Sequence, residues 1–137
     1  MKLNNIDSIK IINLEHIITD KTNMYILDRI EKLMKIKRIF FISSSQEKAK
    51  KGFHAHKIDN QIISCVYGQI QLTIKDGKSK KVINIKNPKK FVYVPVHLWT
   101  ETKYLIKNSV VCVFSSSYYN EKSYIRNFND YLEFRKN

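Results

Sequence analysis

The chain has 137 residues, 43% of them hydrophobic and 12% aromatic, a composition that excludes a disordered chain and predicts one globular domain over residues 1–137. No apolar run approaches the roughly 20 residues of a membrane span, and polar residues follow Met1-Lys2 where a signal peptide would be apolar. We therefore expect a cytoplasmic protein with no membrane partner. Cys65 and Cys112 lie within apolar runs, which predicts buried free thiols.

The formal net charge of +13 has two explanations, a nucleic-acid-binding surface or a lysine-rich composition. Most of the basic residues are Lys and are spread along the whole chain. Surfaces that read bases or clamp phosphates usually recruit Arg, because its planar fork binds two acceptors at once. We therefore expect no nucleic-acid partner, while the positive potential would attract a small anionic substrate.

The N-terminal part of the chain carries mixed signals. Residues 9–18 and 24–27 have the composition of strands. Residues 24–35 also fit a short helix, because Leu27, Ile30 and Leu33 recur at helical spacing. Both interpretations of this region remain open at the level of the sequence.

From residue 37 onward, short runs rich in β-branched and aromatic residues alternate with turn signals, which predicts strands. Residues 69–75 alternate polar and apolar side chains, as a half-buried strand does, and Asp76-Gly77 predicts a hairpin turn after them. Residues 110–114 are apolar throughout, which predicts a strand buried on both faces. The expected strands are 37–42, 61–67, 69–75, 82–85, 91–94 and 110–114.

These elements predict an all-β fold. Residues 43–51 are polar and are expected to form a loop, and a helical turn is expected near the end of the tail, 118–137. Eight to ten short antiparallel strands in a chain of this length indicate a jelly-roll β-barrel. Such a barrel can hold one small ligand in its mouth.

The segment Gly52-Phe53-His54-Ala55-His56-Lys57 places two histidines at positions i and i+2. In a strand, side chains alternate between faces, so His54 and His56 should point the same way. Two imidazoles on one face suit either a metal site or an acid/base pair.

The residues around this pair resemble the cupin superfamily. His54, His56, Gln61 and Gly68 keep the spacing of its first motif, in which a ligating Glu stands at the place of Gln61. Residues 95–100 fit its second motif, with Thr100 at the place of a ligating His. An amide and a hydroxyl are poor ligands for Zn, Fe or Mn. We therefore expect no metal and no cofactor, with a metal-dependent cupin enzyme as the alternative.

A more specific resemblance rests on several segments together. They are Lys-Arg-Ile-Phe-Phe-Ile at 37–42, Lys-Gly-Phe-His-Ala-His-Lys at 51–57, Gln61, the turn at 76–77, and the run 117–126 that ends in Tyr-Ile-Arg. Together they resemble the dTDP-sugar 3,4-ketoisomerases, which are small cupin enzymes of deoxysugar biosynthesis. The resemblance implies a cupin-type jelly roll that moves the ketone of dTDP-4-keto-6-deoxyglucose from C4 to C3 without a metal. It also implies a homodimer, commonly with exchanged N-terminal strands, and a product that is then aminated to a 3-amino-3,6-dideoxyhexose for a surface glycan.

The same resemblance implies roles for individual residues. The acid/base chemistry falls to His54 and His56, without a division of the two carbons between them. Arg38 and Lys51 are candidates for binding the diphosphate, with solvated surface positions as the alternative. Trp99 is expected to flank the nucleotide or the sugar, unless it packs in the core.

Two polar positions near the histidines carry further expectations. Gln61 would hydrogen-bond a sugar oxygen or orient a histidine, and Thr100 is expected among the substrate-binding residues. Members of the family often carry a tyrosine in the strand after the arginine as a third acid/base group, but this chain has Phe40 and Phe41 there. Either the histidines suffice, or Thr100 or Tyr93 supplies a hydroxyl.

Two other classes of function stay open beside these. A dTDP-sugar 3,5-epimerase would act on the same substrate but invert C5 and C3. A sugar-nucleotide binding module would keep the site and lack the turnover.

Overall fold

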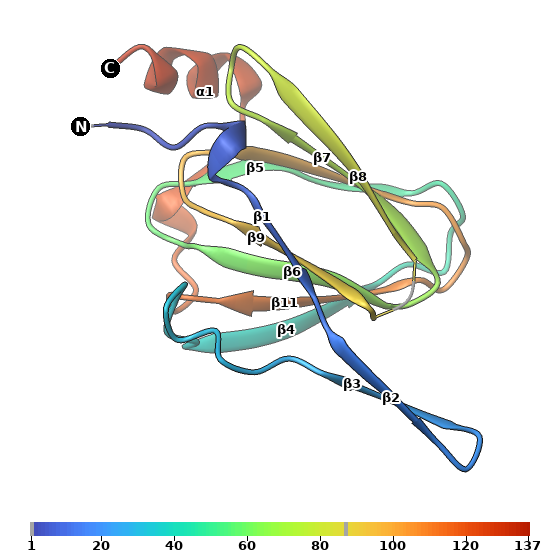
Figure 1. Cartoon of the computed structure of the whole chain (residues 1–137). Coiled ribbons are helices and arrows are strands. Elements are labelled where there is room, and N and C mark those ends of the chain that lie inside the picture. The colour runs from blue at the N-terminus through green and yellow to red at the C-terminus, as the bar shows by residue number, and fades with distance from the viewer. Residues whose placement is uncertain (1, 87) are drawn as a thin grey trace.

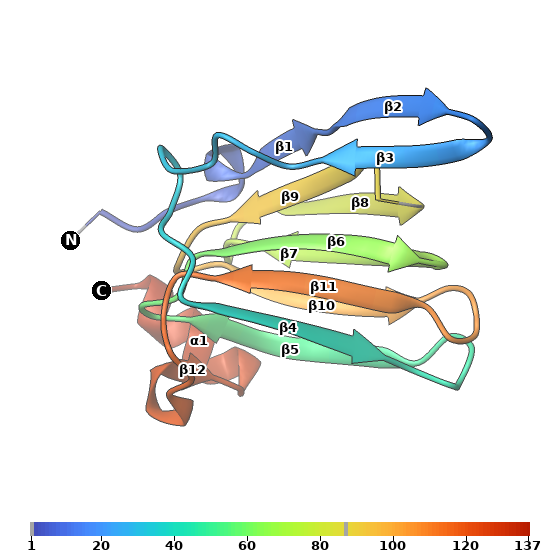
Figure 2. The same ribbon diagram turned by 90° about the horizontal axis from the view of Figure 1, so that it is seen from below.

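The computed structural model describes residues 2–86 and 88–137, and within them ten strands form two five-stranded antiparallel sheets that face each other (Figures 1 and 2). The first sheet has the order β1 (Lys10–Asn13), β9 (Lys90–Val94), β6 (Gln61–Tyr67), β11 (Val110–Ser115), β4 (Arg38–Ser43). The second has the order β12 (Tyr124–Ile125), β5 (Lys50–His56), β10 (Trp99–Tyr104), β7 (Gln69–Lys75), β8 (Lys80–Lys86). The all-β jelly-roll prediction is confirmed.

The remaining elements lie around this sandwich. A hairpin of β2 (Glu15–Thr19) and β3 (Thr22–Ile26) extends away from it (Figure 1). Two short 3₁₀ helices, η1 (Ile6–Ser8) and η2 (Glu121–Ser123), precede β1 and β12. The helix α1 (Phe128–Arg135) closes the described chain, where the sequence predicts a helical turn. No helix among the described residues has the length and apolar character needed to cross a membrane.

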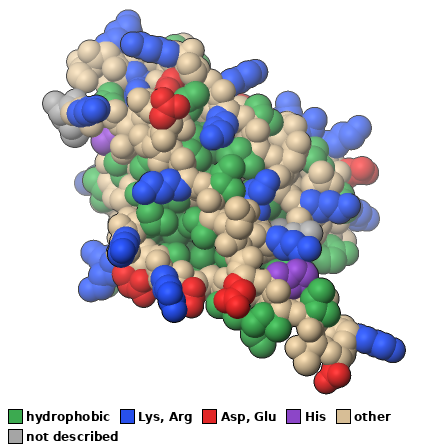
Figure 3. Space-filling model, in the orientation of Figure 1, with side chains coloured by type: hydrophobic (Ala, Val, Ile, Leu, Met, Phe, Trp, Pro, Cys, Tyr) green, Lys and Arg blue, Asp and Glu red, His purple; other side chains and the backbone are tan. Residues whose placement is uncertain are grey.

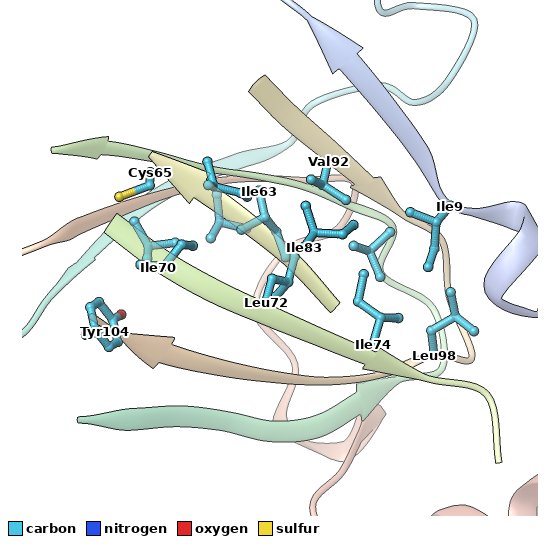
Figure 4. Close-up of a cluster of buried hydrophobic side chains, with 14 residues drawn as sticks. Ile9, Ile63, Cys65, Ile70, Leu72, Ile74, Ile83, Val92, Leu98 and Tyr104 are labelled. Carbon is cyan, nitrogen blue, oxygen red and sulfur yellow. The ribbon is translucent and has the colours of Figure 1, made fainter. Parts of the chain in front are cut away.

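The main core lies between the two sheets and follows from the alternation along β7 (Figure 4). Ile70, Leu72 and Ile74 are fully buried, while the polar residues between them face outward. They meet Ile63 and Val92 from the opposite sheet. Burying each such side chain contributes about 1.5–3 kcal/mol to stability.

Two smaller apolar clusters cover the outer faces of the sheets. On the second sheet, Trp99 and Ala55 pack against Tyr131 and Phe128 of α1. On the first sheet, Ile62 and Phe91 pack under the segment 27–36. Buried polar residues instead follow one another from the end of β5 to the start of β6, at His56, Asp59 and Gln61.

Several sequence expectations need correction. Residues 24–35 form no helix, because residues 22–26 pair with β2 and residues 31–33 form a turn. The helically spaced Leu27, Ile30 and Leu33 instead pack as an irregular segment on the first sheet. The expected strand at 9–18 divides into β1 and β2, and the loop at 43–51 is shorter, because β5 begins at Lys50.

Other expectations are confirmed. Cys65 and Cys112 are buried free thiols. The turn at Asp76-Gly77 joins β7 to β8, and Asp76 accepts hydrogen bonds there from the backbone N–H groups of Lys78 and Ser79. Figure 3 shows Lys and Arg side chains scattered over the visible face instead of gathered in one patch, as the lysine-rich interpretation predicts.

Candidate active site

The histidine pair lies at the end of β5, directly after an irregularity in the strand. The register between β5 and β10 shifts at Thr100, and both Gly52 and Phe53 have positive φ angles, of 89° and 56°. A side chain at Gly52 would come within 3.0 Å of the Thr100 carbonyl oxygen, so glycine is the residue that fits. After this bulge His54 and His56 face the same way, and their ring centroids lie 4.7 Å apart.

An aromatic side chain from the C-terminal segment covers both imidazoles. Tyr124 of β12 pairs with His56 in the sheet, and its ring centroid lies 4.4 Å from that of His56 and 5.1 Å from that of His54. The guanidinium of Arg126 lies over the Tyr124 ring at 4.4 Å and is held by Glu121, with 2.8 Å between Nη2 and Oε2. The segment 116–126 therefore forms a wall of the site.

A buried carboxylate lies beside the pair. Asp59, in the loop between β5 and β6, is 2% exposed, and its Oδ2 lies 4.0 Å from His56 Nδ1. Burial alone would raise the pKa of Asp59, but hydrogen bonds from Ser115 and Gln61 hold it below the usual 3.8. Asp59 is therefore an ionised carboxylate at neutral pH.

Arg38 at the start of β4 is the partner of this carboxylate. Its Nη2 lies 3.1 Å from Asp59 Oδ2 and donates to the Ser115 hydroxyl at 3.0 Å. The guanidinium also contacts the rings of Phe40 and Tyr119, at 5.0 and 5.5 Å from their centroids. Arg38, on the first sheet, thus pairs with the carboxylate that lies beside His56 of the second sheet.

The site holds several buried polar atoms that have no hydrogen-bond partner. Among the described residues these include Arg38 Nε, His54 Nδ1, and both ring nitrogens of His56. An unpaired buried polar atom costs about 1–3 kcal/mol, and such atoms are uncommon in folded proteins. Their grouping in one place indicates a site built to receive a ligand that has oxygen atoms to offer.

Burial controls the ionisation of the two histidines. It lowers the pKa of His56 from the usual 6.5 to about 3, with a further contribution from His54, and the nearby Asp59 opposes this only in part. The pKa of His54 is also lowered, mainly by burial, against a hydrogen bond with the backbone of Gly52. Both rings are therefore neutral at pH 7, in the form that can accept a proton.

Two further predicted residues also lie at this site. Gln61 of β6 is buried, and its Nε2 donates to Asp59 at 2.9 Å. Thr100 is buried opposite His54 in the sheet, and its hydroxyl donates to the His54 carbonyl at 3.5 Å. Lys51 is exposed on β5, three positions before His54 along the chain and opposite Thr102.

Three other residues lie away from the pair. Trp99 is 2% exposed and packs against Phe128 and Tyr131 in the outer cluster, so the indole takes the core-packing alternative. Tyr93 belongs to the cluster under segment 27–36 on the outer face of the first sheet, so it brings no hydroxyl to the histidines. His97 turns its ring toward Phe134 of α1, with centroids 5.7 Å apart.

The sequence analysis missed Asp59, Ser115 and Tyr124 as site residues. Tyr124 stands in the Tyr-Ile-Arg run, which carries the family resemblance but gives no spatial position. Asp59 follows the histidine motif closely and offered a signal, since an acid so near an apolar strand has to be paired if it is buried. Among the described residues, no group of three or more His, Cys, Asp or Glu side chains has a geometry that could hold a metal ion.

Comparison with known proteins places this geometry in a family. A curated relative from Aneurinibacillus thermoaerophilus, named TDP-4-oxo-6-deoxy-alpha-D-glucose-3,4-oxoisomerase, is 28% identical over 126 residues, 91% of each chain. The structure of WlaRB, a TDP-quinovose 3,4-ketoisomerase from Campylobacter jejuni, matches with a TM-score of 0.85 and 27% identity, over 93% of this chain and 99% of that one.

A third similar protein shows the shared fold. A variant of the 3,4-ketoisomerase QdtA from Thermoanaerobacterium thermosaccharolyticum, solved with TDP-4-keto-6-deoxyglucose, matches with a TM-score of 0.88 and 23% identity, over 96% of each chain. The family model described as FdtA: WxcM-like, C-terminal matches residues 7–136. With nearly its whole length matched, the chain belongs to the FdtA family, whose description is WxcM-like, C-terminal.

Proposed function

We propose that this protein is a sugar-nucleotide 3,4-ketoisomerase that moves the keto group of dTDP-4-keto-6-deoxyglucose from C4 to C3. The observation that carries the proposal is the same-face pair of neutral imidazoles, in which both ring nitrogens of His56 and Nδ1 of His54 are buried without a hydrogen-bond partner. The curated relative, whose printed name is that of such an oxoisomerase, supports it over 91% of the chain.

The reaction needs only proton transfers, which the site can supply. A neutral imidazole removes the proton from C3, and a proton reaches the C4 oxygen, giving an enediol or enediolate. A proton is then delivered to C4 while the C3 hydroxyl loses its own, which leaves the ketone at C3. His54 and His56 share these transfers, because one side chain does not reach all four positions. No redox partner is consumed, since the two carbons exchange oxidation states.

The other site residues bind and orient the substrate in this proposal. Arg38 Nε is a buried donor without a protein partner, and Lys51 adds an exposed cation on β5, so both suit the anionic diphosphate. Gln61 uses its amide nitrogen to donate to Asp59, and its amide oxygen would accept a hydrogen bond from a sugar hydroxyl. Thr100 supplies a hydroxyl beside the His54 backbone, where the chain has Phe40 and Phe41 in place of a tyrosine.

The direct test is incubation of the purified protein with dTDP-4-keto-6-deoxyglucose, followed by NMR of the product. A new C3 ketone with a proton at C4 supports the proposal. Inversion at C5 would identify an epimerase, and unchanged substrate that nevertheless binds would identify a binding module.

We further propose that the product is aminated in the synthesis of a 3-amino-3,6-dideoxyhexose. Coupling the reaction to an aminotransferase that accepts a 3-keto sugar would test this step. The proposed location is the cytoplasm, as the sequence analysis expects.

We also propose that the protein acts as a homodimer. Large apolar side chains are exposed on the β2–β3 hairpin, at Ile18 (68%) and Met24 (57%), and on the outer face of the edge strand β4, at Ile39 (52%) and Phe41 (65%). Exposed apolar groups of this size are typical of subunit interfaces. Within one chain β1 pairs with β9, and exchange of this strand between subunits stays a prediction. Sedimentation of wild type and Phe41→Asp tests the dimer, which the variant should weaken.

A further inference from the structure

Asp59 is the most heavily engaged side chain of the site, although it offers no free atom to a substrate. Its Oδ2 accepts from Gln61 at 2.9 Å and from the Ser115 hydroxyl, and it pairs with Arg38 at 3.1 Å. Its Oδ1 accepts from the backbone N–H groups of Ser116 and Ser117, at 3.0 and 3.1 Å. Both oxygens of the carboxylate are therefore saturated by the protein itself.

These contacts determine where the Arg38 guanidinium lies. Nη2 is fixed by Asp59 and Ser115, which leaves Nε buried and without a partner. A free Arg side chain carries about 2 kcal/mol of rotamer entropy, and a carboxylate that removes this freedom before binding lowers the cost of using the remaining donor. The carboxylate thus organises Arg38 in advance of the ligand.

The same carboxylate fixes the wall of the site. Ser116 and Ser117 begin the segment 116–126, and this segment carries Tyr124 onto the two imidazoles. The Asn60 backbone N–H donates to the Ser116 hydroxyl at 2.9 Å, a second link between the same two loops. One side chain therefore ties the start of β4, the start of β6 and the covering segment together around His54 and His56.

We propose that Asp59 is a positioning residue, which holds the Arg38 guanidinium and the segment 116–126 against the histidine pair so that they meet the substrate already in place. This inference rests on the proposed function and deepens it by adding a residue that acts through others. Asp59 itself touches neither the substrate nor the reacting carbons.

The variant Asp59→Asn tests the inference, with Asp76→Asn as its matched control. Asparagine keeps the size of the side chain but removes the charge and turns an amide donor toward the donors around it. Asp76 is likewise buried and accepts backbone N–H groups, from Lys78, Ser79 and Ile6, but it lies in the turn between β7 and β8. Any effect of losing a buried carboxylate in general should appear in both variants.

The measurements are dTDP affinity by calorimetry, KM and kcat with the keto sugar, and ¹⁵N relaxation of the Arg38 Nε–H group. We expect Asp59→Asn to raise the dissociation constant and KM about tenfold, the loss of roughly one charge-assisted hydrogen bond, and to make Arg38 mobile. Asp76→Asn should lower the melting temperature and leave dTDP affinity within about twofold. In an Arg38→Gln background, Asp59→Asn should add less than about a further twofold, because the two act as one unit.

Each outcome decides the inference. Unchanged affinity and an equally rigid Arg38 in Asp59→Asn would overturn it, and so would full additivity with Arg38→Gln. If Asp59→Asn does not fold, relaxation in the wild type decides, because a freely rotating Arg38 guanidinium contradicts positioning and a rigid one supports it. A wild type that binds dTDP but leaves the sugar unchanged is a failure of the proposed function alone, since affinity and relaxation still report on Asp59.

Discussion

The Tyr124 ring meets the His56 ring edge to face, with centroids 4.4 Å apart and an interplanar angle of 65°. The same ring also contacts His54, so one aromatic side chain restricts both imidazoles. Aromatic contacts of this kind contribute about 0.5–1.5 kcal/mol beyond the burial of area. Proton transfer needs each imidazole within hydrogen-bond reach of its target, so small rotations of these rings should be costly.

Two substitutions of Tyr124 distinguish the contribution of its ring from that of its hydroxyl. Tyr124→Phe keeps the contact with both imidazoles, and we expect kcat within about threefold of wild type. Tyr124→Leu removes the aromatic ring, and we expect kcat to fall about tenfold or more. A tenfold fall corresponds to an increase of about 1.4 kcal/mol in the activation free energy. Steady-state assays of the two variants provide the measurement. A Tyr124→Phe variant as impaired as Tyr124→Leu would instead assign the chemistry to the hydroxyl.

The histidine pair gives the strongest expected effect. His54→Asn and His56→Asn should each abolish ketone migration while the protein still folds and binds dTDP, because general acid/base groups contribute about 10²–10⁴-fold each. Solvent deuterium exchange at C3, followed by NMR, divides the roles: the variant that lacks the C3 base loses the exchange. Near-normal turnover in both variants would reduce the histidines to positioning residues.

Lys51 and Lys50 form a matched pair of neighbouring exposed lysines on β5, whose side chains alternate between the two faces of the strand. If Lys51 contacts the diphosphate, Lys51→Ala should weaken dTDP binding by about three- to tenfold, with a shallower dependence on salt concentration. Lys50→Ala removes the same charge from the other face and should change affinity by less than about twofold. Calorimetry at two salt concentrations compares them, and equal losses in both variants would indicate general attraction by charge.

Stability should fall in mild acid because of the buried histidines. The pKa of His56 is about 3 in the folded protein against the usual 6.5, so between these values the unfolded chain binds more protons. The stabilisation is complete above about pH 6.5 and is lost as the pH falls, by at most about 1.4 kcal/mol per pH unit for each such group. The lowered pKa values of His54 and His97 act in the same direction.

Denaturation with urea at several pH values checks this expectation. The lowered pKa values of Asp59 and Asp76 add a loss only near and below their usual 3.8, so the range from pH 6.5 to 4.5 reports on the histidines. His56→Asn should give a flatter dependence across that range. A wild-type stability that does not change between pH 7 and pH 4.5 would show that these rings bind protons as readily in the folded protein as in the unfolded chain.

Turnover should not depend on a metal. By the resemblance to the cupin motifs, Gln61 and Thr100 stand at the places of a ligating Glu and a ligating His, and the Gln61 amide is engaged with Asp59. Two imidazoles with an amide and a hydroxyl make a weak set of ligands for Zn, Fe or Mn. We expect elemental analysis to give far less than one metal per chain, and a chelator to leave the rate unchanged. Stoichiometric metal together with loss of activity on chelation would contradict this.

The local pattern of the sequence was sufficient for six of the strands, from 37–42 to 110–114, and for the face on which the histidines lie, but it did not predict β10 or β12. The alternation in residues 69–75, the turn at Asp76-Gly77 and the i, i+2 spacing of His54 and His56 depend on neighbours along the chain, and the geometry of a strand converts them directly into faces. The helically spaced apolar residues after Met24 stayed ambiguous, because a short apolar run fits both the helical and the strand period until the segment that it packs against is known.

Only the tertiary structure decided which side chains meet at the site. Asp59, Arg38 and Ser115 converge from three elements distant in sequence, and Tyr124 reaches the imidazoles only because β12 pairs with the end of β5. Trp99 and Tyr93, which the sequence made candidates for the site, lie in the outer clusters, because α1 and segment 27–36 cover the outer faces of the sheets. Pairing between strands and burial by distant segments depend on the whole chain at once. A sequence motif can therefore predict the chemistry of the histidines, but the fold determines which side chains contact them.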